Sequence, residues 1–128
     1  YSRNIRNEIK KGRKIYFYDN GIRNTIIGDF KSMDARPDKG ALWENFLVAE
    51  RMKQNSYKCT LAKPYFWRST QQQEVDYVEE KSQQLYGFEF KWDPKKKPKL
   101  PKTFMDRYHA IGEVITRDNF RSFVMIEE

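Results

Sequence analysis

Two β-prone segments at hairpin distance constrain the fold of this chain more than any other feature of its sequence. They cover residues 74–78 and 85–92, and a short turn is expected between them. Side chains alternate between the two faces of a strand, so Phe88, Phe90 and Trp92 share one apolar face in the second segment. The sequence therefore predicts a hairpin that packs this face against a helix and leaves its other face for polar groups.

The remaining elements alternate between strands and helices. We expect strands over 14–18, 65–68 and 113–116, helices over 21–27, 40–54 and 102–110, loops over 29–39 and 93–102, and a last strand or short helix over 120–126. Asp19 is expected to cap the first helix. The helix over 40–54 has the clearest signal, since Leu42, Trp43 and Phe46 recur at helical spacing. The order predicts an α/β fold, a mixed sheet flanked by helices.

Length and composition narrow the class of protein. The chain has 128 residues, enough for one domain, which we place at 14–128, with 1–13 as a connector from a missing upstream region. The single Cys59 excludes a cysteine-ligated zinc site and fits a cytoplasmic location. No apolar run reaches the ~20 residues of a membrane span. Lys and Arg number 25 against 18 Asp and Glu, and the resulting charge of +7 suits a polyanion such as DNA.

The polar face of the hairpin holds the candidate chemistry. Glu89 and Lys91 share the face opposite the aromatic residues, and on the other segment Asp76 is expected on one face with Val75 and Tyr77 on the opposite face. Hairpin pairing brings Asp76 close to Glu89. Two adjacent carboxylates repel each other and take up a proton or a cation. Oxygen ligands favour Mg²⁺ or Mn²⁺, and the main-chain carbonyl of Phe90 is a further candidate ligand.

Lys91 completes the pattern, because an ammonium beside the ion could orient a water or stabilise charge on a phosphate in the transition state. An acid two residues before a lysine is common in this chain, and it occurs at Glu8, Asp29, Glu79, Glu89 and Asp93. The fourth of these alone lies within a strong strand that has an apolar opposite face. The competing interpretation is an exposed cross-strand salt bridge of little energetic value.

Together these residues resemble the PD-(D/E)XK nuclease superfamily, in which a helix acid precedes an Asp on one strand and Glu-x-Lys on the next. The matching positions are Glu44, Asp76, Glu89 and Lys91. The segments 14–21, 40–46, 65–68 and 95–104 look like the C-terminal domain of many prokaryotic AAA-type ATPases, a domain of unknown function. The resemblance covers nearly the whole chain.

The resemblance implies a restriction-endonuclease-like fold and metal-dependent hydrolysis of DNA with Mg²⁺ or Mn²⁺. It also implies an upstream ATPase module on the same polypeptide, and nucleases of this type include homodimers. Two glutamates compete as the helix acid. Glu44 is favoured by its place after Gly40, while Glu50 lies nearer the centre of the apolar helix face and is the rival, or a residue that supports the site. The alternative function is a non-catalytic DNA-binding, regulatory or assembly module of that ATPase.

Basic residues outside the motif are candidate phosphate contacts. Lys95, Lys96 and Lys97 form a basic loop, and clustered lysines bind phosphates without reading sequence. Arg68 at a strand end is another candidate, with an exposed strand arginine as the competing interpretation. His109, the only histidine, is expected to have a surface or packing role.

Overall fold

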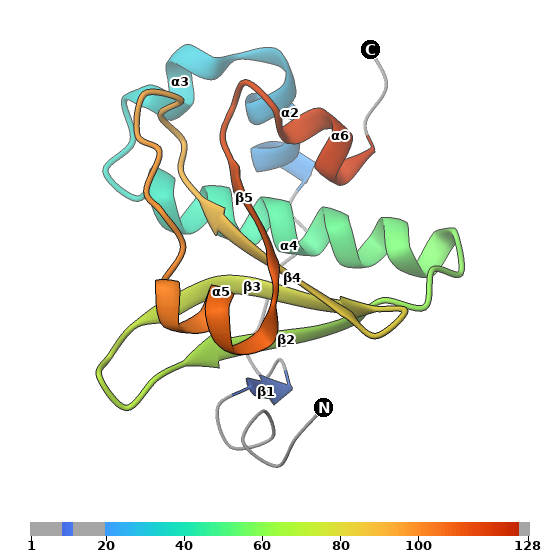
Figure 1. Ribbon diagram of the computed structural model, residues 1–128. Coiled ribbons are helices and arrows are strands. Elements are labelled where there is room, and N and C mark those ends of the chain that lie inside the picture. The colour runs from blue at the N-terminus through green and yellow to red at the C-terminus, as the bar shows by residue number, and fades with distance from the viewer. Residues whose placement is uncertain (1–8, 12–19, 126–128) are drawn as a thin grey trace.

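The computed structural model describes residues 9–11 and 20–125, and its centre is a mixed β-sheet (Figure 1). The strands lie in the order β1-β2-β3-β4-β5, with bounds Ile9–Lys11, Lys63–Arg68, Glu74–Lys81, Gln84–Phe90 and Ile111–Ile115. Neighbours from β1 to β4 are antiparallel, and β5 runs parallel to β4. The expected α/β fold with a mixed sheet flanked by helices is confirmed.

Helices cover both faces of the sheet. Their bounds are Asn20–Gly28 for α2, Phe30–Asp34 for α3, Lys39–Tyr57 for α4, Lys102–Tyr108 for α5 and Phe120–Val124 for α6. Helices α2, α3, α4 and α6 contribute to one apolar cluster, and α5 packs on the other face in a second cluster (Figure 1). No helix in the described part of the chain is long and apolar enough to cross a membrane.

The apolar side of α4 explains why this helix crosses the sheet. Trp43, Phe46 and Leu47 are spaced by three and four residues, and all three are buried. The ring of Trp43 meets the rings of Trp92 and Phe120 edge to face, each at a centroid distance of 5.1 Å. Burial of each such side chain contributes about 1.5–3 kcal/mol, so this face anchors α4 beside the end of β4.

Several expectations about the helices are confirmed and one about a loop is wrong. The helices expected over 21–27, 40–54 and 102–110 correspond to α2, α4 and α5, and the open choice over 120–126 is settled by helix α6. The expected loop over 29–39 contains helix α3 instead, because Asp29 caps it by accepting hydrogen bonds from the N–H and the hydroxyl of Ser32. The strand expected over 14–18 and the cap at Asp19 lie outside the described residues.

The hairpin between β3 and β4 forms as expected. Its turn consists of Ser82 and Gln83, which have φ of 51° and 64°. A two-residue loop with positive φ at both positions matches the right-handed twist of the paired strands. Strand β4 ends at Phe90, so Lys91 lies just beyond it rather than inside the strand.

A bulge in β3 changes the expected alternation. Tyr65 pairs with Val78 and Trp67 pairs with Val75, so two residues of β3 lie opposite a single residue of β2. Tyr77 packs in the cluster beneath α4, but Val75 packs with Val78 in the cluster beneath α5. The expectation that Val75 and Tyr77 share a face is therefore wrong, because strict alternation fails at a bulge.

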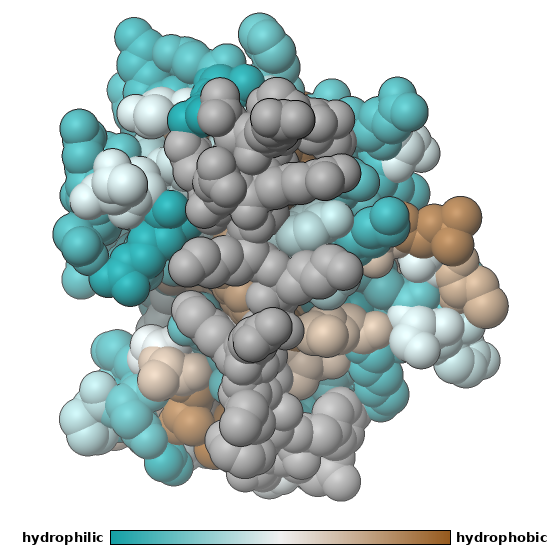
Figure 2. All heavy atoms as spheres, turned by 90° about the horizontal axis from the view of Figure 1, so that it is seen from below, coloured by the Kyte–Doolittle hydropathy of each residue, from teal (hydrophilic) through white to brown (hydrophobic). Residues whose placement is uncertain are grey.

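One stretch of surface is apolar. The C-terminal end of α4 and the connection to β2 carry Tyr57 and Leu61, which are 83% and 88% exposed. Hydrophobic side chains protrude at this side of the molecule in the view from below (Figure 2). This part of the surface lies away from the end of β4, where the candidate site is located.

Candidate functional site

Asp76 occupies the bulge of β3 at the end of the β3–β4 ladder. Its Oδ2 accepts a hydrogen bond of 2.8 Å from the main-chain N–H of Phe90. The paired register, in which Tyr77 faces Phe88, continues by one residue to place Asp76 across from Glu89. A side-chain carboxylate thus takes the place of the next ladder bond, and this contact fixes its position against β4.

Glu89 lies beside Asp76, as the sequence predicts. Burial raises the pKa of the Glu89 carboxyl, and the negative charge of Asp76 and a hydrogen bond between the two carboxyl groups raise it further. The positive charge of Lys91 lowers the pKa of Glu89, but the raising effects are larger and the pKa of Glu89 is about 8. At neutral pH the Glu89 carboxyl is therefore protonated, and its O–H donates a hydrogen bond to the Asp76 carboxylate.

The backbone of Lys91 is held on both sides, while its side chain is exposed. Its N–H donates to the carbonyl of Ile115 at 3.0 Å, and its own carbonyl accepts from the indole Nε1–H of Trp43 at 3.1 Å. These contacts come from β5 and from α4. They fix the position from which the ammonium group extends next to the carboxyl pair.

The two candidate helix acids lie in different surroundings. Glu44 is half-buried and follows Trp43, whose indole contacts Lys91. Glu50 is 2% exposed, and its Oε1 pairs with the Nε of Arg23 on α2 at 3.0 Å. Among the described residues no group of three or more Asp, Glu, His or Cys side chains gathers at a common point that could hold a metal ion. The carboxyl pair is therefore joined by neither Glu44 nor Glu50.

The comparisons with known proteins identify the family of this chain. Residues 39–125 match the model of a family described as Domain of unknown function (DUF4143). The chain belongs to the DUF4143 family. The matched residues include α4, the whole β3–β4 hairpin and the elements that hold Lys91, so the candidate site lies within the DUF4143 domain.

Two mycobacterial proteins are similar to this DUF4143 domain. They are Uncharacterized protein Mb2031c of Mycobacterium bovis and Uncharacterized protein Rv2008c of Mycobacterium tuberculosis. Each is 32% identical over 93 residues, which cover 69% of this chain and 20% of the relative. The chain thus spans about a fifth of the length of the curated relatives it matches. No solved structure matches it.

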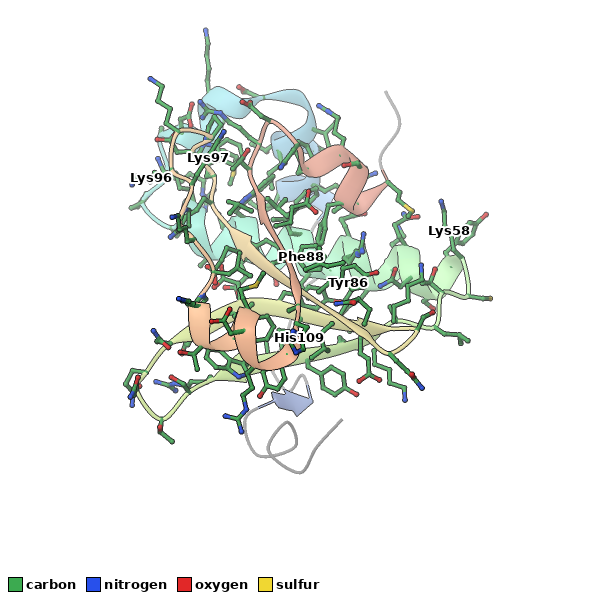
Figure 3. All side chains as sticks on the ribbon, viewed as in Figure 1. Lys58, Tyr86, Phe88, Lys96, Lys97 and His109 are labelled. Atoms are coloured by element: carbon green, nitrogen blue, oxygen red, sulfur yellow. The ribbon has the colours of Figure 1, made fainter. Side chains whose placement is uncertain are left out.

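The predicted phosphate contacts of the DUF4143 domain lie at two places. Arg68 at the end of β2 is exposed and pairs with Glu74 of β3 at 3.2 Å. Lys95, Lys96 and Lys97 are exposed on the loop between β4 and α5. Figure 3 shows Lys96 and Lys97 together on this loop and Lys58 on the opposite side of the molecule. The basic loop therefore follows the candidate site along the chain and stands apart from the C-terminal end of α4.

A buried ionic network of the domain was missed by the sequence analysis. Glu79 is 3% exposed, and its carboxylate accepts two bonds of 2.9 Å from the guanidinium of Arg51 and one each from Asn55 and Tyr77. Burial by itself raises the pKa of Glu79, but the hydrogen bonds and charge of Arg51 outweigh it and lower the pKa. Arg51 also donates to the carbonyl of Phe123 at 2.7 Å. The network joins α4, β3 and α6, and its role is structural rather than catalytic.

A second cluster braces the loop that follows Lys91. Asp34 of α3 accepts hydrogen bonds from the indole N–H of Trp92 and from the guanidinium of Arg117, the latter at 2.9 Å. The Arg117 guanidinium also lies 5.6 Å from the centre of the Trp92 ring. Asp34 lies in the segment 29–39, which the sequence predicted to be a loop. These contacts hold the first residue after Lys91 in place, so they support the geometry of the candidate site.

Proposed function

We propose that this domain is a metal-dependent nuclease that hydrolyses phosphodiester bonds of DNA. The observation that supports this function best is the carboxyl pair of Asp76 and Glu89, in which burial and the charge of Asp76 raise the pKa of Glu89 to about 8. A pair that retains a proton because its charges repel each other also has affinity for a cation that replaces that proton. Lys91 lies two residues from Glu89, where its positive charge acts on the same site.

The donor atoms fit a hard divalent ion. Asp76 and Glu89 supply carboxylate oxygens, and Mg²⁺ is commonly bound by one or two carboxylates together with water and substrate phosphates. The N–H of Phe90 points to Asp76, and in an extended strand the carbonyl of a residue faces the same edge as its N–H. The Phe90 carbonyl is thus a third donor. Glu44 is the helix acid of the family pattern, and in the described structure it does not gather with the carboxyl pair.

The residues of the chain have distinct tasks in this proposal. A bound Mg²⁺ or Mn²⁺ supplies polarisation of the phosphodiester and a lower pKa for the attacking water. The N–H of Phe90 keeps the Asp76 carboxylate aimed at the site before substrate arrives. The Lys91 ammonium stabilises negative charge on the phosphate oxygens, and its fixed backbone limits the reorganisation that this requires. Lys95, Lys96, Lys97 and Arg68 contact the DNA backbone.

The wider proposals rest on the resemblance to PD-(D/E)XK nucleases and to the C-terminal domain of AAA-type ATPases. The matched region covers 20% of each relative, which leaves room for an ATPase module on the same polypeptide. A cytoplasmic location and a homodimeric state belong to the same proposal.

Plasmid nicking in the presence of Mn²⁺ tests the proposed activity. Asp76→Asn keeps an oxygen acceptor for the Phe90 N–H but removes the charge, so we expect a folded protein that has lost cleavage. Asp106→Asn alters an exposed acid on α5 and serves as the control that retains cleavage. Cleavage that persists in both Asp76→Asn and Lys91→Ala comes from another source and excludes the assignment.

A second function is favoured by one observation, the two-carboxylate composition of the site among the described residues. The family pattern includes a helix acid that does not join this pair, so the site also fits a non-catalytic DNA-binding, regulatory or assembly module of an ATPase. Mn²⁺ titration separates the two functions. Salt-sensitive DNA binding without any heat of Mn²⁺ binding supports the non-catalytic module.

A further inference from the structure

Strand β5 forms one border of the sheet and presents part of its backbone away from β4. The carbonyl of Ile115 accepts from Lys91 at 3.0 Å, so Ile115 and, by alternation, Glu113 and Ile111 pair toward β4. The backbone N–H and C=O of Val114 point away from β4, and this carbonyl accepts a hydrogen bond from the Nδ2–H of Asn119 at 2.9 Å. The remaining outward groups are the N–H of Val114 and both polar groups of Gly112. In the described part of the chain β5 pairs with β4 alone.

A hollow of about 280 Å³ lies next to this border, on the α4 and α6 face of the sheet. Its lining combines aromatic and aliphatic side chains with charged and polar ones, and the residues are Arg51, Tyr86, Phe88, Ile111, Glu113, Ser122 and Phe123. Ile111 and Glu113 point into it from β5, and Ile111 is 53% exposed. Figure 3 shows Tyr86 and Phe88 side by side along β4 at this place.

The charges at the hollow favour a cation. The guanidinium of Arg51 is bound by both oxygens of Glu79 and by the carbonyl of Phe123. Glu113 is exposed at the mouth of the hollow. The carboxylates of Glu79 and Glu113 together outnumber the single guanidinium of Arg51, which leaves one net negative charge. Aromatic rings beside that charge suit the aliphatic stem and the cationic head of a lysine or arginine.

We propose that the border of β5 binds an extended segment of a partner protein, which adds a strand to the sheet and places a Lys or Arg side chain in the hollow. The N–H and C=O of Gly112, which pair with no described strand, supply the pairing bonds, as in other strand additions. Glu113 and the aromatic walls supply the preference for a basic side chain. A second copy of this chain fits less well, because antiparallel pairing of two β5 strands about Glu113 sets two carboxylates opposite each other.

Fluorescence anisotropy with the full 128-residue chain tests this proposal. The probe is a short capped peptide of alternating valine and threonine with one central lysine, compared with the same peptide carrying a central glutamate. We expect the lysine peptide to bind at least about tenfold more tightly, which corresponds to roughly 1.4 kcal/mol. Alternate N–H groups of the extended peptide form two sets, one facing β5 and one facing away. N-methylation of the set that faces β5 removes the pairing donors and is expected to abolish binding.

A charge swap makes the result specific to the hollow. Glu113→Lys is expected to weaken the lysine peptide and strengthen the glutamate peptide, while Asp106→Asn changes neither. Thermal melts establish that both variants are folded. Equal affinity of the two peptides, indifference to methylation, or no binding of either peptide overturns the proposal. Sedimentation that shows a dimer dissociated by Glu113→Lys overturns it in favour of self-association.

Discussion

The carboxyl groups of Asp76 and Glu89 are joined by a hydrogen bond at the end of the β3–β4 ladder, and burial and the charge of Asp76 bring the pKa of Glu89 from 4.5 to about 8. Asp76 itself is fixed by the N–H of Phe90. The folded protein therefore binds a proton that the unfolded chain releases at lower pH. This difference links the candidate site to the stability of the domain.

The free energy of unfolding is expected to fall as pH rises from about 4.5 to about 8. Between these values the folded state binds more protons than the unfolded state, so the stabilisation is complete below the lower pKa and lost through the upper one. The loss is on the order of 1–2 kcal/mol, since Glu89 is partly screened by solvent. Urea unfolding at a series of pH values measures it. Glu89→Gln should flatten this dependence and Asp106→Asn should keep it; a dependence unchanged in Glu89→Gln would falsify the assignment of the proton.

The lysines near the site are expected to have two different roles, DNA binding for Lys96 and cleavage for Lys91. Lys96→Gln removes a phosphate contact, so we expect the slope of log Kobs against log salt for DNA binding to become shallower by about 0.9. Lys58→Gln, on the opposite side of the molecule, is the matched control and leaves the slope unchanged. Lys91→Ala is expected to lower cleavage by at least about a hundredfold with little change in DNA affinity. Similar effects of Lys58→Gln and Lys96→Gln would show that the basic loop has no special part in binding.

Gly87→Ala is expected to destabilise the domain by about 1–3 kcal/mol through overpacking. An added Cβ would lie 2.7 Å from Cε2 of Phe104 and 2.8 Å from Cδ2 of Leu100. Gly40→Ala is the control, because nothing lies within 4 Å of its added Cβ and alanine favours the helix by up to about 1 kcal/mol. Thermal unfolding of the two variants measures the difference. A neutral Gly87→Ala would mean that α5 and its preceding loop do not pack closely on β4.

Glu79→Gln is expected to cost about 3–5 kcal/mol, because it leaves the half-buried guanidinium of Arg51 without its charge partner. Replacement of both residues by methionine should recover part of that loss, since the desolvation of both charges is then avoided. Glu74→Gln breaks the exposed pair with Arg68 and should cost less than about 1 kcal/mol. Denaturant unfolding of the variants gives these values, and equal costs for the buried and the exposed pair would refute the structural role of the network.

The sequence could predict the hairpin and the carboxyl pair for identifiable reasons. Residues 87–92 alternate between aromatic and non-aromatic side chains, and the spacing to β3 allows only a short turn, so the approach of Asp76 to Glu89 follows from register. The sequence did not reveal the bulge, because a bulge depends on how β3 pairs with β2 rather than on local composition. It is this irregularity that turns Val75 toward α5.

The buried network and helix α3 depend on contacts distant in sequence. Glu79 lies two residues after Tyr77 on β3, so its side chain is on the same face as that core aromatic residue. An acid on a buried face needs a partner that compensates its charge. Arg51 lies 28 residues away, so local pattern could not identify it as that partner. Helix α3 is short, and its Asp34 is tied to Trp92 and Arg117 only once the chain has folded.

Calorimetric titration of Mn²⁺ into the folded chain at about pH 6.5, repeated in buffers of different ionisation enthalpy, tests the carboxyl pair most directly. The proposed site predicts one bound ion and release of about one proton, since the ion displaces the proton held by Glu89. In Glu89→Gln both the binding and the proton release should be lost, while Asp106→Asn should retain them. An absence of Mn²⁺ binding, or binding that survives Glu89→Gln without proton release, would contradict a metal site at Asp76 and Glu89.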